Sequence, residues 1–173
     1  NWKELLNMSK TIADRNKFFN HIKKLNLRNS IFIDNTASEN ISNEYIKYLE
    51  NNIGVVTCNK IACASSLVNY QEIKKTARHF GTPFLFETNV GAALPVIDTL
   101  NNLIASGDKI HEIQAILSGS LNYIFNNFSL KTKFKDVVLS AQKEGFTEPD
   151  PKIDLSGVDV ARKILILARE SGF

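Results

Sequence analysis

The 173-residue chain has little of what marks membrane, secreted or nucleic-acid-binding proteins. Its two cysteines, Cys58 and Cys63, lie five positions apart without a histidine cluster, a spacing that makes neither a disulfide framework nor a zinc site. We therefore expect a reducing, cytoplasmic setting. No apolar run approaches the ~20 residues of a membrane-spanning helix, and no signal-peptide pattern opens the chain. The net charge of +3 is small and evenly spread, so neither a membrane nor a nucleic-acid partner is expected.

The composition of the chain is that of a globular protein. Apolar residues make up 43% and charged residues 23%, values that argue against long disordered segments and allow a sizeable core. The chain begins within a patterned segment, "NWKELLNMSK", without an initiator methionine, and it stops directly after a helical pattern. We therefore expect it to be part of a longer protein.

Short β-rich runs alternate with helical patterns in the first half. Residues 31–33, "IGVVTCNK" (53–60) and "TPFLFETNV" (82–90) are predicted strands, separated by helical spacing in 42–52 and 65–81. Ser42 is a possible N-cap of the first of these helices, and Gly81 stands where a C-cap glycine belongs. Residues 14–27 form a further amphipathic pattern. This order predicts βαβ units and a parallel, nucleotide-type sheet.

The pattern changes after Gly91. Residues 94–108 read as a helix with Pro95 in its first turn and Gly107 at its end. The alternating stretch "KIHEIQAIL", residues 109–117, predicts a half-buried strand, and 118–129, 134–145 and 156–172 predict helices. The fold class is therefore α/β, with a second, α+β half that begins near residue 90.

Polar side chains follow the first two predicted strands. Asp34, Asn35 and Thr36 come after one, and Thr57, Cys58, Asn59 and Lys60 come after the next. Ligands of open parallel sheets bind beyond the carboxyl ends of strands, so these side chains are well placed for a cofactor. The alternatives are an Asx turn and a surface loop lysine. A thiol nucleophile at Cys58 is a weaker hypothesis, because no histidine lies near it in sequence.

Two later stretches are also candidates. "ETNVGAALP", residues 87–95, combines a carboxylate with a loop whose carbonyls could bind a hard cation, although a tight turn explains it as well. In "GFTEPDPKIDLSGVDVARKILILARESG", Ser156 and Asp159 fit a helix capping pattern, and Asp159 can pair with Lys163 four residues on. Capping does not explain Glu148 and Asp150 between prolines, nor a lysine on an apolar helix that we expect to be buried on most sides.

Taken in order, "DNTAS", "TCNK", "ETNVGAALPVI", "ILSGSLNYIF" and "GFTEPDPKIDLSGVDVARK" resemble the homoserine dehydrogenase family. They are most similar to the dehydrogenase part of its bifunctional aspartokinase/homoserine dehydrogenase members, over nearly the whole chain. The resemblance implies reversible reduction of L-aspartate 4-semialdehyde to L-homoserine with NADP or NAD as cofactor, in threonine and methionine biosynthesis. A dehydrogenase for another semialdehyde, or a non-catalytic dimerisation or regulatory module, remains the alternative.

The resemblance also implies roles for residues on the substrate side. Lys163 matches the lysine that gives a proton to the aldehyde oxygen, and Lys60 matches a second active-site lysine that also contacts the cofactor. Glu148 and Asp159 match substrate-binding carboxylates, natural partners for the ammonium group of an amino-acid substrate. Asp154 lies in the same acidic group.

Cofactor and cation roles follow from the same resemblance. Asn35 and Thr36 match residues near the nicotinamide, and Gly145 matches another cofactor contact. A sodium or potassium ion is implied, bound mostly through main-chain oxygen of four residues: Glu87, Val90, Ala92 and Leu94.

The resemblance divides the chain into two expected domains. Residues 1–90 would be the C-terminal part of a dinucleotide-binding, partial Rossmann-type domain, and 91–173 part of an α+β catalytic and dimerisation domain, so a homodimer or higher homo-oligomer is expected. The family's Gly-rich phosphate turn has no counterpart here, so we expect the chain alone to be inactive. Cys58 stands where a proline is expected, and Thr88, Asn89 and Ala93 vary the cation-loop pattern.

Overall fold

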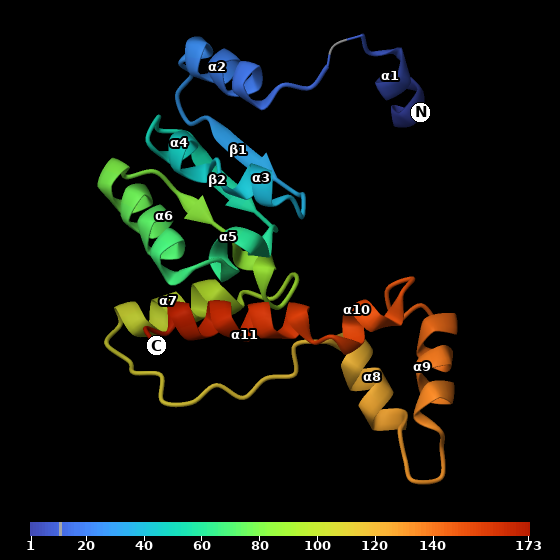
Figure 1. The fold of residues 1–173 in the computed structure, drawn as a ribbon. Coiled ribbons are helices and arrows are strands. Elements are labelled where there is room, and N and C mark those ends of the chain that lie inside the picture. Colours follow the sequence, from blue (N-terminus) through green and yellow to red (C-terminus); the bar gives the residue numbers. More distant parts are fainter. Residues whose placement is uncertain (11) are drawn as a thin grey trace.

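A computed structural model describes residues 1–10 and 12–173 as a mixed α/β protein (Figure 1). Three strands form one parallel sheet in the order β1 (Ile31–Asp34), β2 (Gly54–Thr57) and β3 (Phe84–Leu85). The strands consist largely of the branched and aromatic residues that suit a pleated surface. This confirms the predicted parallel sheet, although its third strand is shorter than the sequence pattern indicated.

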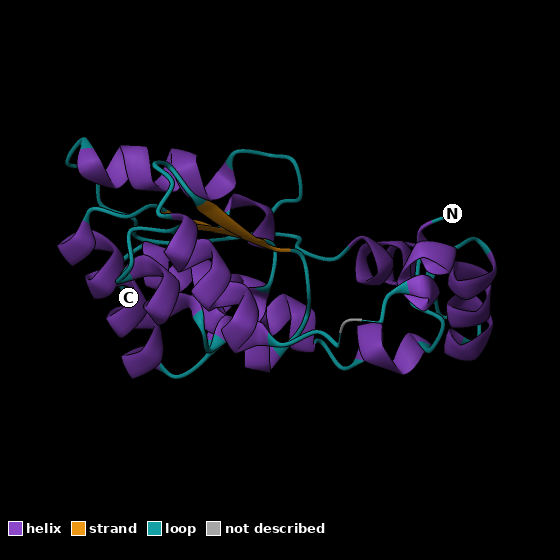
Figure 2. Ribbon diagram, turned by 90° about the horizontal axis from the view of Figure 1, so that it is seen from above, coloured by secondary structure: helices purple, strands orange, loops and turns teal. Residues whose placement is uncertain are grey.

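Helices connect and flank the strands of this half, and they lie on both sides of the sheet when it is seen from above (Figure 2). The helical elements are α1 (Trp2–Met8), α2 (Arg15–Leu25), α3 (Glu39–Ser42), α4 (Tyr45–Leu49), α5 (Lys60–Ala64), α6 (Leu67–Phe80) and the 3-10 turn η1 (Glu87–Asn89). Gly81 adopts φ 61° at the end of α6, which confirms it as the C-cap. Ser42 as an N-cap was wrong: it is the last residue of α3, and its hydroxyl donates to the Glu39 carbonyl.

Two apolar clusters hold the sheet and its helices together. The first joins β2 to α4 and α6 through the buried side chains Tyr45, Tyr48, Leu49, Ile53, Val55, Ala62, Ile73 and Ala77. The second joins the end of the sheet to the last helix of the chain through Cys63, Phe86, Val90, Ile97, Ile166 and Leu167. The second cluster therefore places the C-terminal helix against the strand-bearing half.

The second half is helical in the described residues. Its elements are α7 (Val96–Ala105), α8 (Gly119–Asn127), α9 (Phe134–Lys143), α10 (Pro151–Leu155) and α11 (Val158–Glu170). The helices predicted at 94–108, 118–129, 134–145 and 156–172 are confirmed, with Pro95 at the N-cap of α7 rather than within its first turn. Helix α10 was not predicted; Asp150 caps it, and Pro151 occupies its first position, where a missing N–H costs no hydrogen bond.

The strand predicted at 109–117 was wrong. Residues 108–118 run as an irregular segment, and no described strand pairs with them. Burial in this segment does not follow the alternation: Ile113 and Leu117 pack against the second apolar cluster, whereas Ala115 and Ile116 are exposed. Alternation in the sequence does not suffice for a strand, which also needs a hydrogen-bonding neighbour.

The capping prediction for the last helix was also wrong. The N-cap of α11 is Gly157, with φ 69°, and Ser156 ends α10, where its hydroxyl donates to the Ile153 carbonyl. The same hydroxyl accepts from the Val158 N–H at the start of α11, but in the described part of the chain no bond joins it to Asp159 as a capping box requires. Helix α11 is buried on one side only: Ile166 and Leu167 are buried, whereas Ile164 and Leu165 are more than a third exposed. Lys163 therefore lies beside the buried stripe instead of deep inside the protein.

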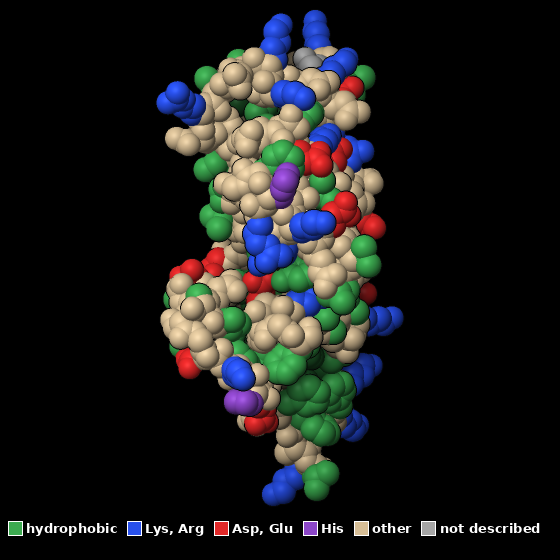
Figure 3. Space-filling model, turned by 90° about the vertical axis from the view of Figure 1, so that its left-hand side faces the viewer, with side chains coloured by type: hydrophobic (Ala, Val, Ile, Leu, Met, Phe, Trp, Pro, Cys, Tyr) green, Lys and Arg blue, Asp and Glu red, His purple; other side chains and the backbone are tan. Residues whose placement is uncertain are grey.

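Helices α8, α9 and α10 form a separate helical group at one end of α11 (Figure 1). Their own small core contains Ile124, Val137 and Ala141. On the face shown in Figure 3, Lys and Arg side chains are dispersed among Asp and Glu along the molecule. Among the described residues, no helix has both the length and the apolar character needed to cross a membrane.

Candidate active site

Two polar segments meet at the carboxyl edge of the sheet. Asp34 ends β1 and Thr57 ends β2, and the register pairs these two residues directly. Asn35 and Thr36 therefore follow one strand next to the segment that leads to Lys60 on the other. The sequence-based prediction that both segments share this edge is confirmed, and it is the edge at which ligands of open parallel sheets bind.

Asp34 is a buried carboxylate at the centre of this edge. It accepts hydrogen bonds from the Tyr45 hydroxyl at 2.5 Å, from Asn59 Nδ2 at 3.0 Å and from the Thr36 backbone N–H at 2.8 Å. Burial by itself would raise the pKa of Asp34, but these donors outweigh it and hold the pKa below its ordinary value. The bond from Thr36 is the Asx turn that was the alternative interpretation of this segment.

Asn59 connects the buried carboxylate to Lys60. Its side-chain oxygen accepts from the Ile61 backbone N–H at 3.1 Å and so caps α5, while its Nδ2 donates to Asp34 and to the Ser38 carbonyl. Lys60 is the first residue of α5. Asn59, which caps α5 and bonds to Asp34, thus holds the start of α5 and Lys60 next to the end of β1.

Helix α11 brings a second lysine to the same place. Asp159 lies between two ammonium groups: Lys60 Nζ is 3.3 Å from its Oδ1, and Lys163 Nζ is 2.7 Å from its Oδ2. Lys163 also donates to the Leu117 carbonyl at 2.8 Å. The structure therefore brings together three of the predicted residues, from two helices that are about a hundred positions apart in the chain.

The electrostatics of this charged cluster (Lys60, Asp159 and Lys163) follow from its geometry. Partial burial alone would raise the pKa of Asp159, but the hydrogen bond from Lys163 and the charge of Lys60 hold that pKa below its ordinary value. The carboxylate therefore stays ionised at neutral pH. It allows two like charges to remain close together, next to the edge where a ligand of the sheet would bind.

The other predicted carboxylates lie in the loop before α10. Asp154 accepts from the Ser120 hydroxyl at 2.7 Å and from the Glu148 backbone N–H at 2.9 Å, so both of its oxygens are engaged. The Glu148 carboxylate is exposed and makes no hydrogen bond or ion pair with a described residue. Neither side chain contacts the charged cluster; Asp154 instead shapes the loop that carries Glu148.

The predicted cation loop follows η1. The two oxygens of Glu87 accept from the backbone N–H groups of Ile97 at 2.8 Å and Asp98 at 2.7 Å, so this carboxylate caps the N-terminus of α7. Ala92 has φ 53°, a left-handed turn, and the Leu94 carbonyl accepts from Val96. The tight turn, which was the alternative interpretation, is thus present.

The same loop retains free oxygen atoms. Among described residues, no hydrogen bond reaches the carbonyls of Val90 or Ala92. Main-chain oxygens with a carboxylate are the donors that a hard cation takes, so the residues fit such an ion. No group of three or more His, Cys, Asp or Glu side chains suited to a metal exists in the described part of the chain.

Gly145 lies apart from the residues at the sheet edge. It follows α9 with φ 78°, and its N–H bonds back to the Gln142 carbonyl, as in a helix C-terminal turn. Among the described residues, no hydrogen bond joins Gly145 to Asn35 or Thr36. Cys58 is closer to them, with its sulfur 3.8 Å from Asn35 Oδ1, and no described histidine pairs with it.

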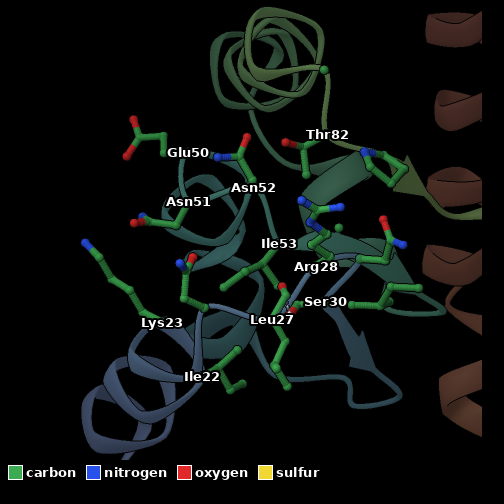
Figure 4. A pocket seen from close by; sticks show the side chains of 16 residues that line it. Ile22, Lys23, Leu27, Arg28, Ser30, Glu50, Asn51, Asn52, Ile53 and Thr82 are labelled. Carbon is green, nitrogen blue, oxygen red and sulfur yellow. Dashed lines mark hydrogen bonds between the residues drawn. The ribbon is translucent and has the colours of Figure 1, made fainter.

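A hollow of about 940 Å³ opens at the opposite, amino edge of the sheet (Figure 4). Lys23, Arg28 and Glu50 are its charged lining residues, together with several asparagines from the loops before β1 and β2. None of the candidate residues lines it. The carboxyl edge, where the lysines and carboxylates converge, is the better candidate because chemistry depends on the groups present and not on volume.

Sequence reasoning missed several residues that organise the site. The Tyr45 hydroxyl completes the bonding around Asp34, and the Leu117 carbonyl accepts a hydrogen bond from Lys163. Arg169 and Glu170 bind α11 to α5 and α6. The sequence signal for these two residues was an Arg-Glu pair at the end of an apolar helix. A basic residue is common at a helix C-terminus, so the pair did not indicate a contact.

Comparison with known proteins identifies the family. A family model described as "Homoserine dehydrogenase, NAD binding domain" matches residues 1–87, and one described as "Homoserine dehydrogenase" matches 95–173. A chloroplastic bifunctional aspartokinase/homoserine dehydrogenase of Arabidopsis thaliana is 46% identical over 99% of this chain and 19% of its own length. A homoserine dehydrogenase of Schizosaccharomyces pombe is 43% identical over 99% of this chain and 46% of its own.

Solved structures agree. A crystal structure of a Candida auris protein of unknown function has a TM-score of 0.87 and 38% identity, over 94% of this chain and 47% of that one. A hyperthermophilic archaeal homoserine dehydrogenase in complex with NADPH has a TM-score of 0.73 and 29% identity, over 82% of this chain and 43% of that one. The chain thus spans about a fifth to a half of the length of such relatives. With both halves matched by its family models, the chain belongs to the homoserine dehydrogenase family.

Proposed function

We propose that this chain contributes the nicotinamide end of the cofactor site and the catalytic lysines of an NAD(P)-dependent homoserine dehydrogenase. The reaction is the interconversion of L-aspartate 4-semialdehyde and L-homoserine, a step towards threonine and methionine. The observation that carries the proposal is the charged cluster of Lys60, Asp159 and Lys163, which joins the two halves matched by the family models. Residues 1–90 would act as the dinucleotide-binding part and 91–173 as the catalytic and dimerisation part.

Lys163 is the proposed proton donor. Reduction of an aldehyde develops negative charge on the carbonyl oxygen, which a nearby ammonium stabilises before transferring a proton to it. Its contacts with Asp159 and the Leu117 carbonyl hold the ammonium in place. Lys60 adds a second positive charge, and Asp159 orients both lysines.

The substrate also carries an ammonium group. The Glu148 carboxylate has no partner among the described residues and is the proposed ligand for it, while Asp154 holds the Glu148 backbone in position. Asp159 would be a second carboxylate near the substrate. Carboxylates that pair with the ammonium would favour an aldehyde that carries an amino group over a simple aldehyde, because a charge-assisted hydrogen bond is stronger than a neutral one.

The cofactor fits the polar carboxyl edge of the sheet, where Asn35, Thr36 and Lys60 would hold its nicotinamide end, with Gly145 as a further contact. When bound, NADPH or NADH supplies the hydride. A sodium or potassium ion would lie at Glu87 and the carbonyls of Val90, Ala92 and Leu94, where it would stabilise the turn between the halves.

The proposed location of the protein is the cytoplasm. A homodimer is proposed because α8 and α9 leave Phe125 and Leu139 half-exposed or more.

The test uses protein expressed from the complete open reading frame. Lys163→Ala should lower kcat for NADPH-dependent reduction of aspartate semialdehyde by about 10²–10⁴-fold, the usual contribution of general acid catalysis. Arg162→Ala, an exposed neighbour on the same helix, is the matched control. Wild-type turnover by the Lys163→Ala protein would remove the lysine from the mechanism, and turnover of a different semialdehyde only would reassign the substrate.

A further inference from the structure

The C-terminal end of α11 is bonded to the end of α5. Arg169 Nη1 donates to the Cys63 carbonyl at 2.6 Å, and Nη2 donates to the Ser65 carbonyl at 2.7 Å. The last carbonyls of a helix lack intrahelical partners and carry partial negative charge, so a forked guanidinium suits them in both geometry and charge. Because Nη1 and Nη2 each donate to a different carbonyl, the contact fixes the orientation of the guanidinium.

The next residue bonds to α6. Glu170 has a side chain only 1% exposed, and it pairs with Lys74 at 2.9 Å and accepts a hydrogen bond from the Tyr70 hydroxyl. A buried carboxylate is tolerated only with such partners. Burial and the bond to Glu170 together raise the pKa of Tyr70, so the tyrosine remains a donor. The Arg169 guanidinium lies 5.2 Å from the centre of the Tyr70 ring.

The charged cluster is the other attachment between the same helices. Lys60, at the start of α5, contacts Asp159 near the start of α11, while the end of α5 contacts Arg169. The two helices therefore run in the same direction, side by side. Asp159 and Arg169 are ten positions apart, about 15 Å along a helix, so the attachments lie at opposite ends of α11.

Apolar packing alone would not fix this arrangement. Ile166 and Leu167 press α11 into the second apolar cluster, and such burial is favourable but non-directional. The helix could turn or slide slightly while both side chains stayed buried. Hydrogen bonds with a defined geometry at its end remove that freedom.

We propose that Arg169 and Glu170 are positioning residues. They fix the rotation of α11 about its axis and its position along that axis, and so keep Asp159 and Lys163 opposite Lys60. The catalytic consequence rests on the proposed function, whereas the geometric consequence does not. The arrangement of the two lysines is set before any ligand arrives, as electrostatic preorganisation requires.

The first test measures geometry without catalysis. Amine acylation of the protein from the complete open reading frame, followed by mass spectrometry, gives a labelling rate for each lysine. In Arg169→Ala, Lys60 and Lys163 should react several-fold faster than in wild type, because their shared contact with Asp159 loosens. Lys75, exposed on α6 and outside both attachments, is the internal reference, and Arg162→Ala is the matched control.

The second test measures turnover. A displacement of about 1 Å can cost about 10²-fold in rate, so Arg169→Ala should lower kcat on that order with KM little changed. Arg169→Lys, which can reach only one of the two carbonyls, should recover part of both the labelling pattern and kcat. The kcat of Glu170→Gln should lie between those of Arg169→Ala and Arg169→Lys, because the amide keeps an acceptor for Tyr70. Far-UV circular dichroism and thermal unfolding establish that each variant is folded.

The outcomes separate the two proposals. Wild-type labelling of Lys60 and Lys163 in folded Arg169→Ala overturns the positioning role; if that variant fails to fold, unchanged labelling in Arg169→Lys does so. Altered labelling in a protein whose wild type reduces no semialdehyde supports the positioning role and overturns the proposed function. Altered labelling with reduced kcat and partial recovery in Arg169→Lys supports both.

Discussion

Lys60 and Lys163 contact different oxygens of one carboxylate, at 3.3 Å and 2.7 Å from Asp159. The Asp159 side chain is 55% exposed, so water screens these pairs and their contribution to stability is small, about 0–1 kcal/mol. Their importance is geometric. A carboxylate between two ammonium groups keeps two like charges close together.

Asp159→Asn should therefore affect activity far more than stability. The amide retains the shape but loses the charge that holds the two lysines together, so kcat should fall by about 10²-fold, as when one preorganised electrostatic group is removed. The free energy of unfolding should change by less than about 1 kcal/mol. Steady-state kinetics and urea unfolding measure the two effects. Asp108→Asn, exposed and remote from the cluster, is the control; an unfolding loss without a kinetic loss would contradict the assignment.

Sequence patterns located the parallel sheet and most helices because alternation and capping are local properties. Strands at 31–33 and within 53–60, and the Gly81 cap, needed no knowledge of distant residues. The strand predicted at 109–117 failed for the opposite reason. Ile113 and Leu117 pack on the second apolar cluster although Ala115 between them is exposed, and no local pattern reveals whether a partner strand is present.

The candidate site shows the same division. The i,i+4 spacing predicted the pair of Asp159 and Lys163, and the strand-end rule placed Lys60 at the carboxyl edge. That these groups meet depends on the packing of α11 against α5, across about a hundred residues. The salt bridge between Lys74 and Glu170 is equally non-local, and nothing in either segment alone indicates it.

Asp34 should contribute more to stability than any exposed carboxylate of the site. Asp34→Ala removes the acceptor that the Asn59 amide and the Tyr45 hydroxyl share. Each keeps one other partner, Ser38 or Thr57, so the loss should be about 1–3 kcal/mol in total, the cost of one unsatisfied buried group. Tyr45→Phe removes only one donor and should cost about 1 kcal/mol. Urea unfolding measures both, with Asn35→Ala, an exposed neighbour, expected within about 0.5 kcal/mol of wild type. Equal, small losses in all three variants would contradict a central role for Asp34.

Acid should destabilise the fold partly through the same residue. Although burial opposes it, the hydrogen bonds to Asp34 hold its pKa in the folded state below the value of about 3.9 in an unfolded chain. Its contribution to stability is therefore complete above that value and is lost as the pH falls through the folded-state pKa. The free energy of unfolding, measured by urea titration from pH 6 to pH 3, should fall less steeply in Asp34→Asn than in wild type. Parallel curves would show that other carboxylates govern acid unfolding.

Glu87 should serve both helix α7 and the proposed cation. Glu87→Ala removes the acceptor for the Ile97 and Asp98 N–H groups and should cost about 0.5–2 kcal/mol, whereas Glu87→Gln, which keeps one oxygen, should cost less.

For the cation, the melting temperature is followed in KCl or NaCl against choline chloride at equal ionic strength, which separates binding from screening. Stabilisation by KCl or NaCl beyond that by choline should disappear in Glu87→Ala. It should persist in Leu94→Ala, because the exposed Leu94 side chain is removed while its main-chain carbonyl remains. Equal effects of all three salts on wild type would exclude the cation site and leave the cap, which the difference between the Ala and Gln variants tests by itself.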